Sequence, residues 1–395
     1  MIYSISILIV SFTVIFCNDF ADYNIVGTTA HGWEFVRDLF LENFIKEKDL
    51  GASIAVYYQG NPVVDLIGGW FDETQIKPYD NNTLQLVFST TKGIVAMAVA
   101  ICVQRGLLDY SALVTKYWPE YGQNGKENTT VADILSHRAG LPYVLSPVDQ
   151  YTNWTAMIHE LEEQQPLWVP GTTHGYHSTT YGWLAGELVR RVDPKKRSFG
   201  QFVKDEITTP TQTEFHIGLP PDMQDRVSPV VPQLDIKNIL NESMLTYFEI
   251  WNDPKIHQAE IPNAIGMSTA WSIARLYAAF IGNIKNKFGQ RLIEDEFMRR
   301  AIKSNTPANE IDLVFQYYSV FAMGFHRYDY ALPAYGVDVF GHHGAGGSIG
   351  FAAPSKNLTF AYVMNRIQTN PAIIIDPRMQ LMLDQIAARI NSQFF

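Results

Sequence analysis

The hydrophobic and polar positions change their period several times along the chain, and each change predicts an element. Between Trp33 and Lys48 the apolar residues recur every three or four positions, which is typical of an amphipathic helix. Two β-rich runs follow, Ala52 to Tyr58 and Val63 to Gly69, and the sequence Gln59-Gly60-Asn61-Pro62 between them predicts a hairpin. From Gly93 to Gln104 nearly every residue is apolar, so we expect a buried helix there.

The end of the chain shows a similar alternation of helix and strand patterns. A helix, three β-like runs and a final helix are predicted over Thr269 to Ile281, Val339 to His342, Ser348 to Ala353, Leu358 to Met364 and Asp376 to Ile390. The middle of the chain has short helical patterns between Pro-rich and Gly-rich loops. We therefore predict an α+β protein in which residues 18–88 and 265–395 form one α/β unit, interrupted by a mainly helical insert of residues 89–264.

Composition and charge exclude several classes of protein. The chain has 395 residues, of which 47% are apolar and 18% are charged, and this balance excludes a disordered chain and a protein with many membrane spans. Forty acidic against 30 basic side chains leave a formal net charge of -10 at pH 7. Because such a charge repels phosphate backbones, nucleic acid is not expected as a partner.

The N-terminus resembles a targeting signal. Residues 2–17 are almost all apolar, but the run is shorter than the about 20 residues that a membrane-spanning helix needs. We expect residues 1–17 to be a signal peptide that is cleaved near Cys17, with an uncleaved membrane anchor as the alternative. Secretion is also favoured by five N-x-[ST] glycosylation sequons, at Asn81, Asn128, Asn153, Asn241 and Asn357.

The patterns needed for disulfides, metals and nucleotide cofactors do not occur. One of the two cysteines falls in the leader, and Cys102 lies in the apolar helical pattern, where a small buried side chain is expected. The pairs His174 with His177 and His342 with His343 have no neighbouring carboxylate, so no metal is expected. Neither a Walker loop nor a strand followed by G-x-G-x-x-G is found, so we expect no cofactor.

One motif match is misleading. The sequence from Gly346 to Gly350 matches the G-x-S-x-G of α/β-hydrolases, in which a helix follows the serine and the base histidine comes later. Here Pro354 and a β-like run follow Ser348, and no histidine occurs after His343. We interpret these glycines instead as part of a strand that another backbone or a ligand approaches closely.

A serine and a lysine at the start of the buried helix form the main candidate site. In Ser89-Thr90-Thr91-Lys92, a spacing of three places both side chains on one face of a helix, so the amine can lie beside the hydroxyl. The helix N-terminus stabilises negative charge that develops there. A lysine within an apolar helix also needs polar partners. The alternative is a serine that only caps the helix, with a structural lysine.

Two distant segments contain candidate partners for this pair. Tyr176 lies in the loop 170–178, and it would act as a general base toward Ser89 if Lys92 lowers the pKa of its phenol. Residues 340–347 would form a strand whose glycines let a substrate lie against its edge.

Three short motifs occur in a fixed order along the chain: Ser89-x-x-Lys92, Tyr176-x-Ser178 and His342-x-Gly344. The segment from Leu135 to Pro142 adds the pattern L-x-H-x-[SA]-G-L-P, in which we interpret the histidine as structural. Together they resemble serine β-lactamase-like and penicillin-binding-protein-like hydrolases, particularly the class C β-lactamase and esterase branch, and they are also similar to animal β-lactamase-related proteins. The resemblance, from about Gly51 to the C-terminus, implies a β-lactamase/transpeptidase-like fold: an antiparallel sheet flanked by helices that meets a helical domain at the active site.

The resemblance implies a catalytic role for four side chains. Ser89 would be the acylated nucleophile, and Lys92 would be its electrostatic neighbour. Tyr176 would shuttle protons. His342 would take the place of the usual lysine of the third motif, unless the adjacent His343 faces the site instead.

The resemblance also implies how a substrate is held. The N–H groups of Ser89 and Ala345, next to Gly344, would form an oxyanion hole. Ser178 would belong to the hydrogen-bond network of the tyrosine. In two places the motifs differ from those of lactamases, which have asparagine at Ser178 and lysine at His342. Both differences are closer to the esterase and peptidase-like members and count against antibiotic hydrolysis.

Two functions from different classes follow. The first is a secreted serine hydrolase that acts on a small-molecule or peptide ester or amide through an acyl-enzyme on Ser89, either as a monomer or as a homo-oligomer. The second is a binding or assembly protein with the same fold and a silent site. The three retained motifs favour the hydrolase, because a silent site is free to lose Lys92 or Tyr176.

Overall fold

A computed structural model describes residues 19–46, 48–233, 249–285, 289–307, 309–368 and 373–392. The predicted signal peptide with Cys17 and the sequon at Asn241 lie outside these residues. Within the described ranges, no helix combines the length and the hydropathy that crossing a membrane requires.

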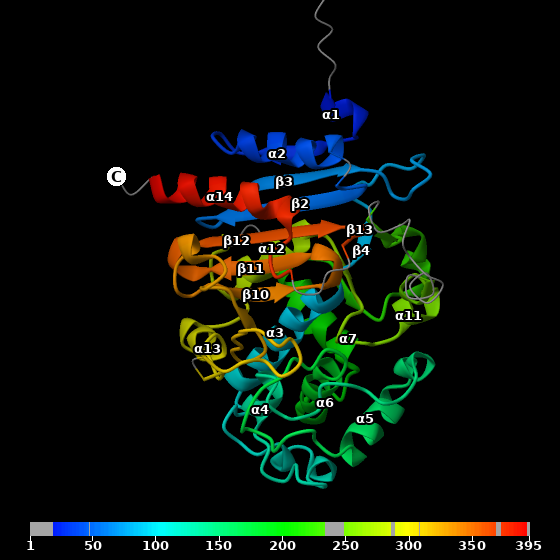
Figure 1. Cartoon of the computed structure of the whole chain (residues 1–395), viewed down its shortest axis with the longest axis vertical. Helices are drawn as coiled ribbons and strands as arrows, with labels where there is room; N and C mark the ends of the chain where they lie inside the picture. The colour runs from blue at the N-terminus through cyan, green and yellow to red at the C-terminus, as the bar shows by residue number, and fades with distance from the viewer. Residues whose placement is uncertain are drawn as a thin grey trace, which may run out of the picture.

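A seven-stranded antiparallel sheet forms the centre of the fold, in the order β1-β3-β2-β12-β11-β10-β9. Its strands are β1 (Val26–Thr29), β2 (Gly51–Tyr58), β3 (Asn61–Gly69), β9 (His326–Arg327), β10 (Phe340–His343), β11 (Ile349–Ala353) and β12 (Leu358–Met364). The predicted hairpin joins β2 to β3, where Gln59 and Gly60 have φ values of 49° and 75°, as a tight two-residue turn requires. Because β2 pairs with β12, the two ends of the chain form one sheet (Figure 1).

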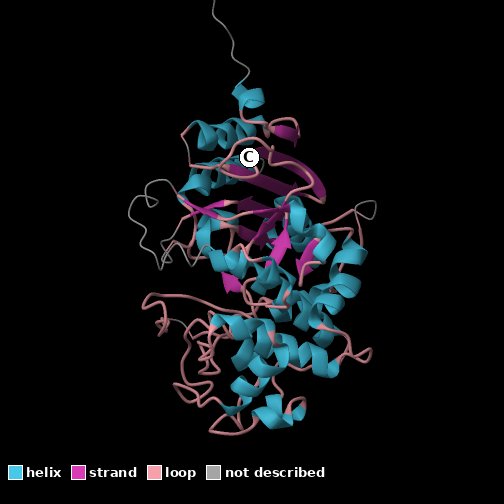
Figure 2. Ribbon diagram, turned by 90° about the vertical axis from the view of Figure 1, so that its right-hand side faces the viewer, coloured by secondary structure: helices cyan, strands magenta, loops and turns pink. Residues whose placement is uncertain are grey.

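Helices cover both faces of this sheet, as the alternation of buried residues along β2 shows. Ile54 and Val56 pack in a core with α2 (Glu34–Ile45) and α14 (Pro377–Ser392), which come from opposite ends of the chain. Ala55 and Tyr57 point the other way and pack in the core that contains α12 (Ala270–Phe280). Figure 2 shows the sheet in the upper half of the molecule and a mostly helical region below it.

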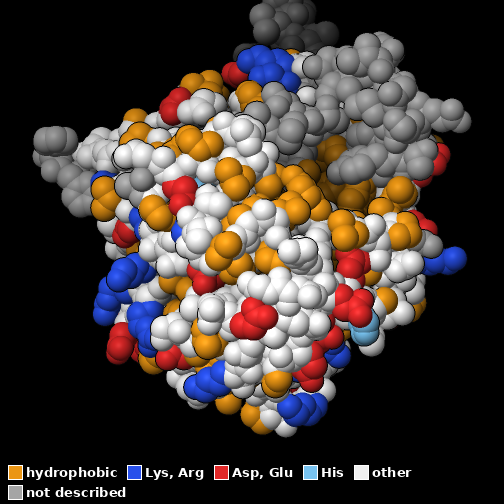
Figure 3. All heavy atoms as spheres, turned by 60° about the horizontal axis from the view of Figure 1, so that its bottom comes forward, with side chains coloured by type: hydrophobic (Ala, Val, Ile, Leu, Met, Phe, Trp, Pro, Cys, Tyr) orange, Lys and Arg blue, Asp and Glu red, His pale blue; other side chains and the backbone are white. Residues whose placement is uncertain are grey.

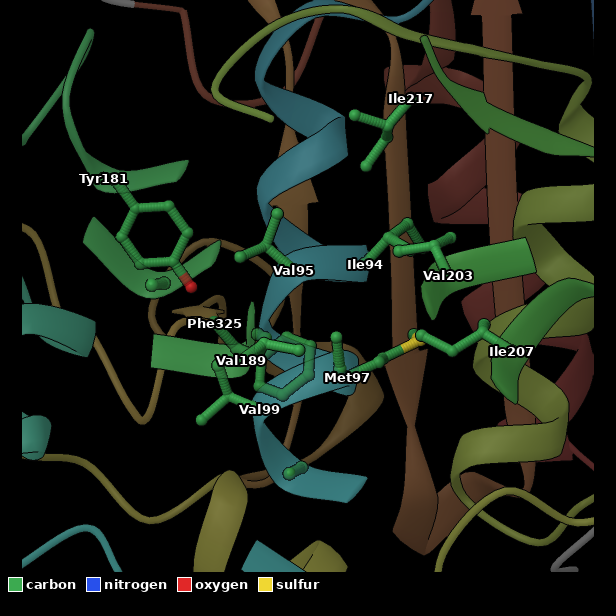
Figure 4. Packing of buried hydrophobic residues seen from close by; sticks show 14 of the residues in the cluster. Ile94, Val95, Met97, Val99, Tyr181, Val189, Val203, Ile207, Ile217 and Phe325 are labelled. Carbon is green, nitrogen blue, oxygen red and sulfur yellow. The ribbon is translucent and has the colours of Figure 1, made fainter. Parts of the chain in front are cut away.

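The helical region is built around α3 (Thr91–Gln104), which is buried over almost its whole length. Figure 4 shows Ile94, Val95, Met97 and Val99 of α3 among apolar side chains from several other segments of the chain, including Tyr181 and Phe325. Burial on all sides explains why the helix carries no polar stripe. Among the described residues, the other α-helices are α1 (Asp19–Asp22), α4 (Val131–Leu135), α5 (Trp154–Glu163), α6 (Tyr181–Val192), α7 (Phe199–Val203), α8 (Thr209–Thr211), α11 (Pro254–Gln258) and α13 (Asp295–Ala301).

Short strands that the sequence did not predict lie between the two regions. A four-stranded sheet has the order β5-β8-β4-β6, and β13 pairs with β7. Their bounds are β4 (Leu84–Leu86), β5 (Phe215–Ile217), β6 (Val227–Ser228), β7 (Val231–Pro232), β8 (Gly266–Ser268) and β13 (Arg366–Ile367). Two or three residues are too few to show an alternating pattern, so only long-range pairing defines these strands.

Candidate active site

The serine of the first motif lies in a 3₁₀ turn, Phe88–Thr90, that leads into α3. Phe88 has a φ of 47°, a left-handed conformation that a bulky residue rarely adopts. Its buried ring packs edge-on against Trp251, with 5.6 Å between ring centroids, and this contact helps to hold the backbone in that conformation. Ser89 is left half-buried just ahead of the helix.

Lys92 lies on the same side of the turn and is fully buried. Its Nζ donates hydrogen bonds to Ser89 Oγ at 2.9 Å, to the carbonyl oxygen of Ser178 at 3.0 Å and to that of Asn263 at 2.8 Å. These three oxygens are neutral, so they offset less of the cost of burying a charge than a carboxylate would. Burial consequently lowers the pKa of Lys92 to about 7.

Tyr176 completes a cluster with Ser89 and Lys92. The Lys92 Nζ lies 5.1 Å from the centroid of the Tyr176 ring, and the Ser89 hydroxyl lies close enough to the phenol to affect its pKa. Burial raises the pKa of Tyr176; the Ser89 hydroxyl opposes this rise, and the Asp312 carboxylate adds to it. Tyr176 was expected to act as a general base only if Lys92 lowers its pKa, and this condition is not met because desolvation raises the pKa. At neutral pH the lysine, not the tyrosine, has the pKa of a base.

Lys92 is bound by the backbone carbonyls of Ser178 and Asn263. The sequence indicated Ser178 but not Asn263. Ser178 contributes its carbonyl oxygen, while its hydroxyl makes only a long contact of 3.5 Å to the carbonyl of Pro142. Asn263, the other residue, comes just before β8, and its side-chain oxygen accepts a hydrogen bond from the N–H of Gly182. No local pattern marks Asn263, because any residue type can present a carbonyl.

Asp312 is a second residue that the sequence analysis missed. It is fully buried, and both of its carboxylate oxygens accept a hydrogen bond from the N–H of Tyr176, each at 3.1 Å. The same carboxylate accepts from the N–H groups of Val314 and Phe315 and from the hydroxyl of Ser319. The Phe315 ring then stacks on the Tyr176 ring, with 4.7 Å between centroids. Asp312 thus fixes the loop that covers Tyr176.

Strand β10 decides which of the two adjacent histidines faces the cluster. The His342 ring lies 6.0 Å from the Tyr176 ring between centroids, whereas His343 forms a 2.7 Å hydrogen bond between its Nδ1 and the hydroxyl of Tyr328. Successive side chains of a strand point to opposite faces, so only His342 is on the side of Tyr176. Burial holds the pKa of His342 well below its usual value, and the ring is neutral at physiological pH.

The glycines after β10 permit a close approach to the nucleophile turn. A Cβ atom on Gly344 would lie 2.3 Å from the carbonyl oxygen of Val87, so only glycine fits beside the turn that carries Ser89. Ala345 follows at the exposed edge. The serine of the G-x-S-x-G match, Ser348, is buried, and its carbonyl accepts hydrogen bonds from Gly344 N–H and Thr90 Oγ1. The close approach is as expected, but the predicted strand over residues 340–347 is too long, because β10 ends at His343 and Ala345–Gly347 form a 3₁₀ turn.

Buried histidines join the loop of Tyr176 to the segment before α5. His137 Nδ1 accepts a hydrogen bond from the N–H of His177 at 3.0 Å, and the His137 carbonyl accepts one from the N–H of Gly175. His174 is bound to Glu310 and Ser319. All three histidines therefore have structural contacts, and nowhere in the described ranges do three or more His, Cys, Asp or Glu side chains form a group that could hold a metal ion.

Comparison with known proteins places the chain in a family. A sequence model of the Beta-lactamase family matches residues 39–381, which is most of the chain. The chain belongs to the β-lactamase family. It is 33% identical over 352 residues to the esterase/beta-lactamase LipL of Mycobacterium tuberculosis, a match that covers 82% of this chain and 79% of the relative.

Solved structures extend the similarity to the whole fold. A family VIII carboxylesterase superposes with a TM-score of 0.82 at 34% identity, covering 93% of this chain and 99% of that one. A penicillin-binding protein homologue from Caulobacter crescentus has a TM-score of 0.78 at 34% identity, with 92% and 99% coverage, and EstA from Arthrobacter nitroguajacolicus Rue61a has 0.79 at 30%, with 92% and 98%. The predicted family and α+β fold are confirmed, and the chain is a serine hydrolase of the β-lactamase-related type.

Proposed function

We propose that this hydrolase cleaves carboxylic esters, and amides by the same chemistry, through an acyl-enzyme on Ser89. The observation that carries the proposal is the pair formed by the Ser89 hydroxyl and the buried Lys92 amine, 2.9 Å apart. Because burial brings the pKa of Lys92 to about 7, much of the amine is neutral at physiological pH and can accept a proton. The relatives named as an esterase and a carboxylesterase support esters as the substrate class.

In the acylation step, the hydroxyl proton of Ser89 passes to Lys92 Nζ while Ser89 Oγ bonds to the carbonyl carbon. The N–H groups of Ser89 and Ala345 stabilise the negative charge on the carbonyl oxygen. When the ester C–O bond breaks, a proton moves from Lys92 through the Tyr176 hydroxyl to the departing alkoxide, and a neutral alcohol leaves. The raised pKa of Tyr176 suits this relay, because the phenol stays protonated.

Deacylation uses the same groups in reverse. Water attacks the acyl carbon and gives a proton to the relay of Tyr176 and Lys92. The bond between the acyl carbon and Ser89 Oγ then breaks, and the relay returns the proton to Ser89 Oγ. We assign to His342 a positioning role, in which its neutral ring packs beside Tyr176 and supports that side chain in the site. Antibiotic hydrolysis is not part of the proposal, since Ser178 lacks the amide that lactamases have in the second motif.

Labelling with a fluorophosphonate tests this function. We expect the purified protein to be labelled and to hydrolyse 4-nitrophenyl acetate, and we expect Ser89→Ala to abolish both. The matched control is Ser348→Ala, which removes the buried serine of the G-x-S-x-G match and should leave labelling intact. Labelling that survives Ser89→Ala would exclude Ser89 as the nucleophile. An unlabelled protein with no turnover across a panel of esters would favour the silent binding protein.

We further propose that the protein is secreted and glycosylated. The apolar N-terminal run supports export, and the four sequon asparagines within the described ranges are all exposed, at Asn81, Asn128, Asn153 and Asn357. Expression of the full chain in animal cells is expected to yield protein in the medium whose mass falls on treatment with an N-glycosidase. Protein that stays in the cells and does not change in mass would contradict this proposal.

A further inference from the structure

Exposed apolar side chains are concentrated on three loops near the candidate site. Thirteen large apolar side chains are exposed in the described part of the chain, and six of them lie in the stretches 143–145, 167–169 and 311–313. They are Tyr143, Leu145, Leu167, Val169, Ile311 and Leu313, with exposures between 44% for Tyr143 and 76% for Leu145. Scattered single apolar residues are ordinary on a surface, but a cluster at one place indicates a binding surface.

All three loops are attached to the segments that hold Tyr176. Leu313 N–H donates to the carbonyl of His174 at 3.0 Å, and Leu167 N–H donates to the carbonyl of Gly140 at 2.8 Å. The N–H of Val144 donates to Thr179 Oγ1 at 2.9 Å. The loops therefore surround the stretch 174–179, which contains Tyr176 and the carbonyl that binds Lys92.

Two of these loops pack beside Gly175, the residue that precedes Tyr176. A methyl group placed on Gly175 would lie 2.8 Å from the Trp168 ring, 3.2 Å from Val314 and 3.4 Å from Leu313. The loops 167–169 and 311–313 thus both lie against the residue that precedes Tyr176. Phe315, two residues after Leu313, is half-buried and stacks its ring on Tyr176.

The third loop borders a groove. Leu145 and Leu167 line a groove of about 700 Å³ together with Ala156, His159 and Gln164. Glu160 and Glu163 lie at the same groove, so an anionic group would be repelled there, while an uncharged chain would not. Figure 3 shows one face of the molecule, with hydrophobic side chains gathered in its upper part and charges of both signs dispersed over the rest.

We propose that this apolar rim, defined as Leu145, Leu167, Val169 and Leu313, binds a long uncharged chain of the ester substrate. The inference rests on the proposed function, because it names the substrate class for the same site: lipophilic esters instead of short polar ones. Each methylene that leaves water on binding adds to the affinity, so selectivity increases with chain length until the rim is covered. The chain can belong to the acyl or to the alcohol part of the ester.

The test compares chain lengths in variants of the full protein. We expect kcat/KM for 4-nitrophenyl octanoate, or for octyl acetate if the alcohol part binds, to exceed that of the corresponding short ester by about 10-fold or more. The double variant Leu167→Ser/Leu313→Ser is expected to lose most of this ratio. Ile76→Ser and Val337→Ser are the controls, since each removes an apolar side chain that is 82% exposed and lies outside the rim loops. A ratio that the rim variant retains would overturn the proposal.

A binding measurement separates this inference from the proposed function. In the Ser89→Ala protein, an uncharged dansyl amide with an octyl chain is expected to bind at least 10-fold more tightly than its methyl counterpart, and the rim variant should remove the difference. Equal binding of the two amides would overturn the inference even if 4-nitrophenyl acetate is hydrolysed. Chain-dependent binding in a protein that hydrolyses no ester would support the rim and refute the catalytic proposal.

Discussion

The Lys92→Met protein is expected to hydrolyse 4-nitrophenyl acetate with a kcat/KM about 10²–10⁴-fold below that of the unchanged protein, because a positioned base contributes that much. The loss follows from the contact between Lys92 Nζ and Ser89 Oγ at 2.9 Å, which no other amine replaces in the cluster described above. Lys92→Arg distinguishes a base from a mere positive charge, since a guanidinium keeps its proton in proteins. We expect Lys92→Arg to be as inactive as Lys92→Met, and substantial activity in it would refute the role as base.

The pH dependence provides a second measurement on the same residue. Burial lowers the pKa of Lys92 from 10.5 to about 7, so kcat/KM of the unchanged protein should rise with pH through about 7 as the amine loses its proton. Between pH 7 and 10 the unfolded chain holds this proton and the folded chain does not, so stability increases with pH. Relative to Lys92→Met, the free energy of unfolding should therefore increase by about 1.4 kcal/mol per pH unit in this window, which chemical denaturation can measure. A flat difference would show that Lys92 is not buried as a neutral amine.

Replacement of Asp312 by alanine is expected to lower the free energy of unfolding by about 3–5 kcal/mol, because each buried donor left without an acceptor costs about 1–3 kcal/mol. The carboxylate accepts hydrogen bonds from the N–H groups of Tyr176, Val314 and Phe315 and from Ser319, and all of these donors lose their acceptor. Since the loop then no longer fixes Tyr176, we also expect kcat to fall about 10–100-fold.

Asp312→Asn is the matched variant, because asparagine keeps the shape and one acceptor oxygen. We expect it to recover part of both losses, measured by urea denaturation and by kcat on 4-nitrophenyl acetate. An Asp312→Ala protein with unchanged stability and unchanged kcat would show that Asp312 does not hold the tyrosine loop.

The parts of the fold that the sequence predicted are those with local periodicity. The amphipathic pattern that begins at Trp33 corresponds to α2, and the run from Leu358 to Met364 has the same bounds as β12. The hairpin after Tyr58 was predictable because a tight turn needs a positive φ, which Gly60 adopts without strain. Strands such as β6, with only two residues, exist through pairing with distant strands and leave no such signal.

In the candidate site too, the sequence predicted the contacts between near neighbours and not those between distant segments. Ser89 and Lys92 could be paired from the sequence because three residues of helical turn bring their side chains together wherever the helix lies. The motif around Tyr176 predicted its presence in the site but not its pKa, because burial by surrounding segments sets that value. Asn263 and Asp312 lie 171 and 136 residues from the groups that they bind, so nothing near them in the sequence indicated their contacts.

The sequence by itself determined the family motifs, the long elements of secondary structure and the pairing of a serine with a lysine on one turn, since all of these depend on neighbours within a few positions. Only the tertiary structure decided that His342 and not His343 is next to Tyr176, that Lys92 has no carboxylate among its three partners, and that three apolar loops surround the same segment. These properties arise where distant segments pack together and exclude water, and the local pattern of residues carries no information about that packing.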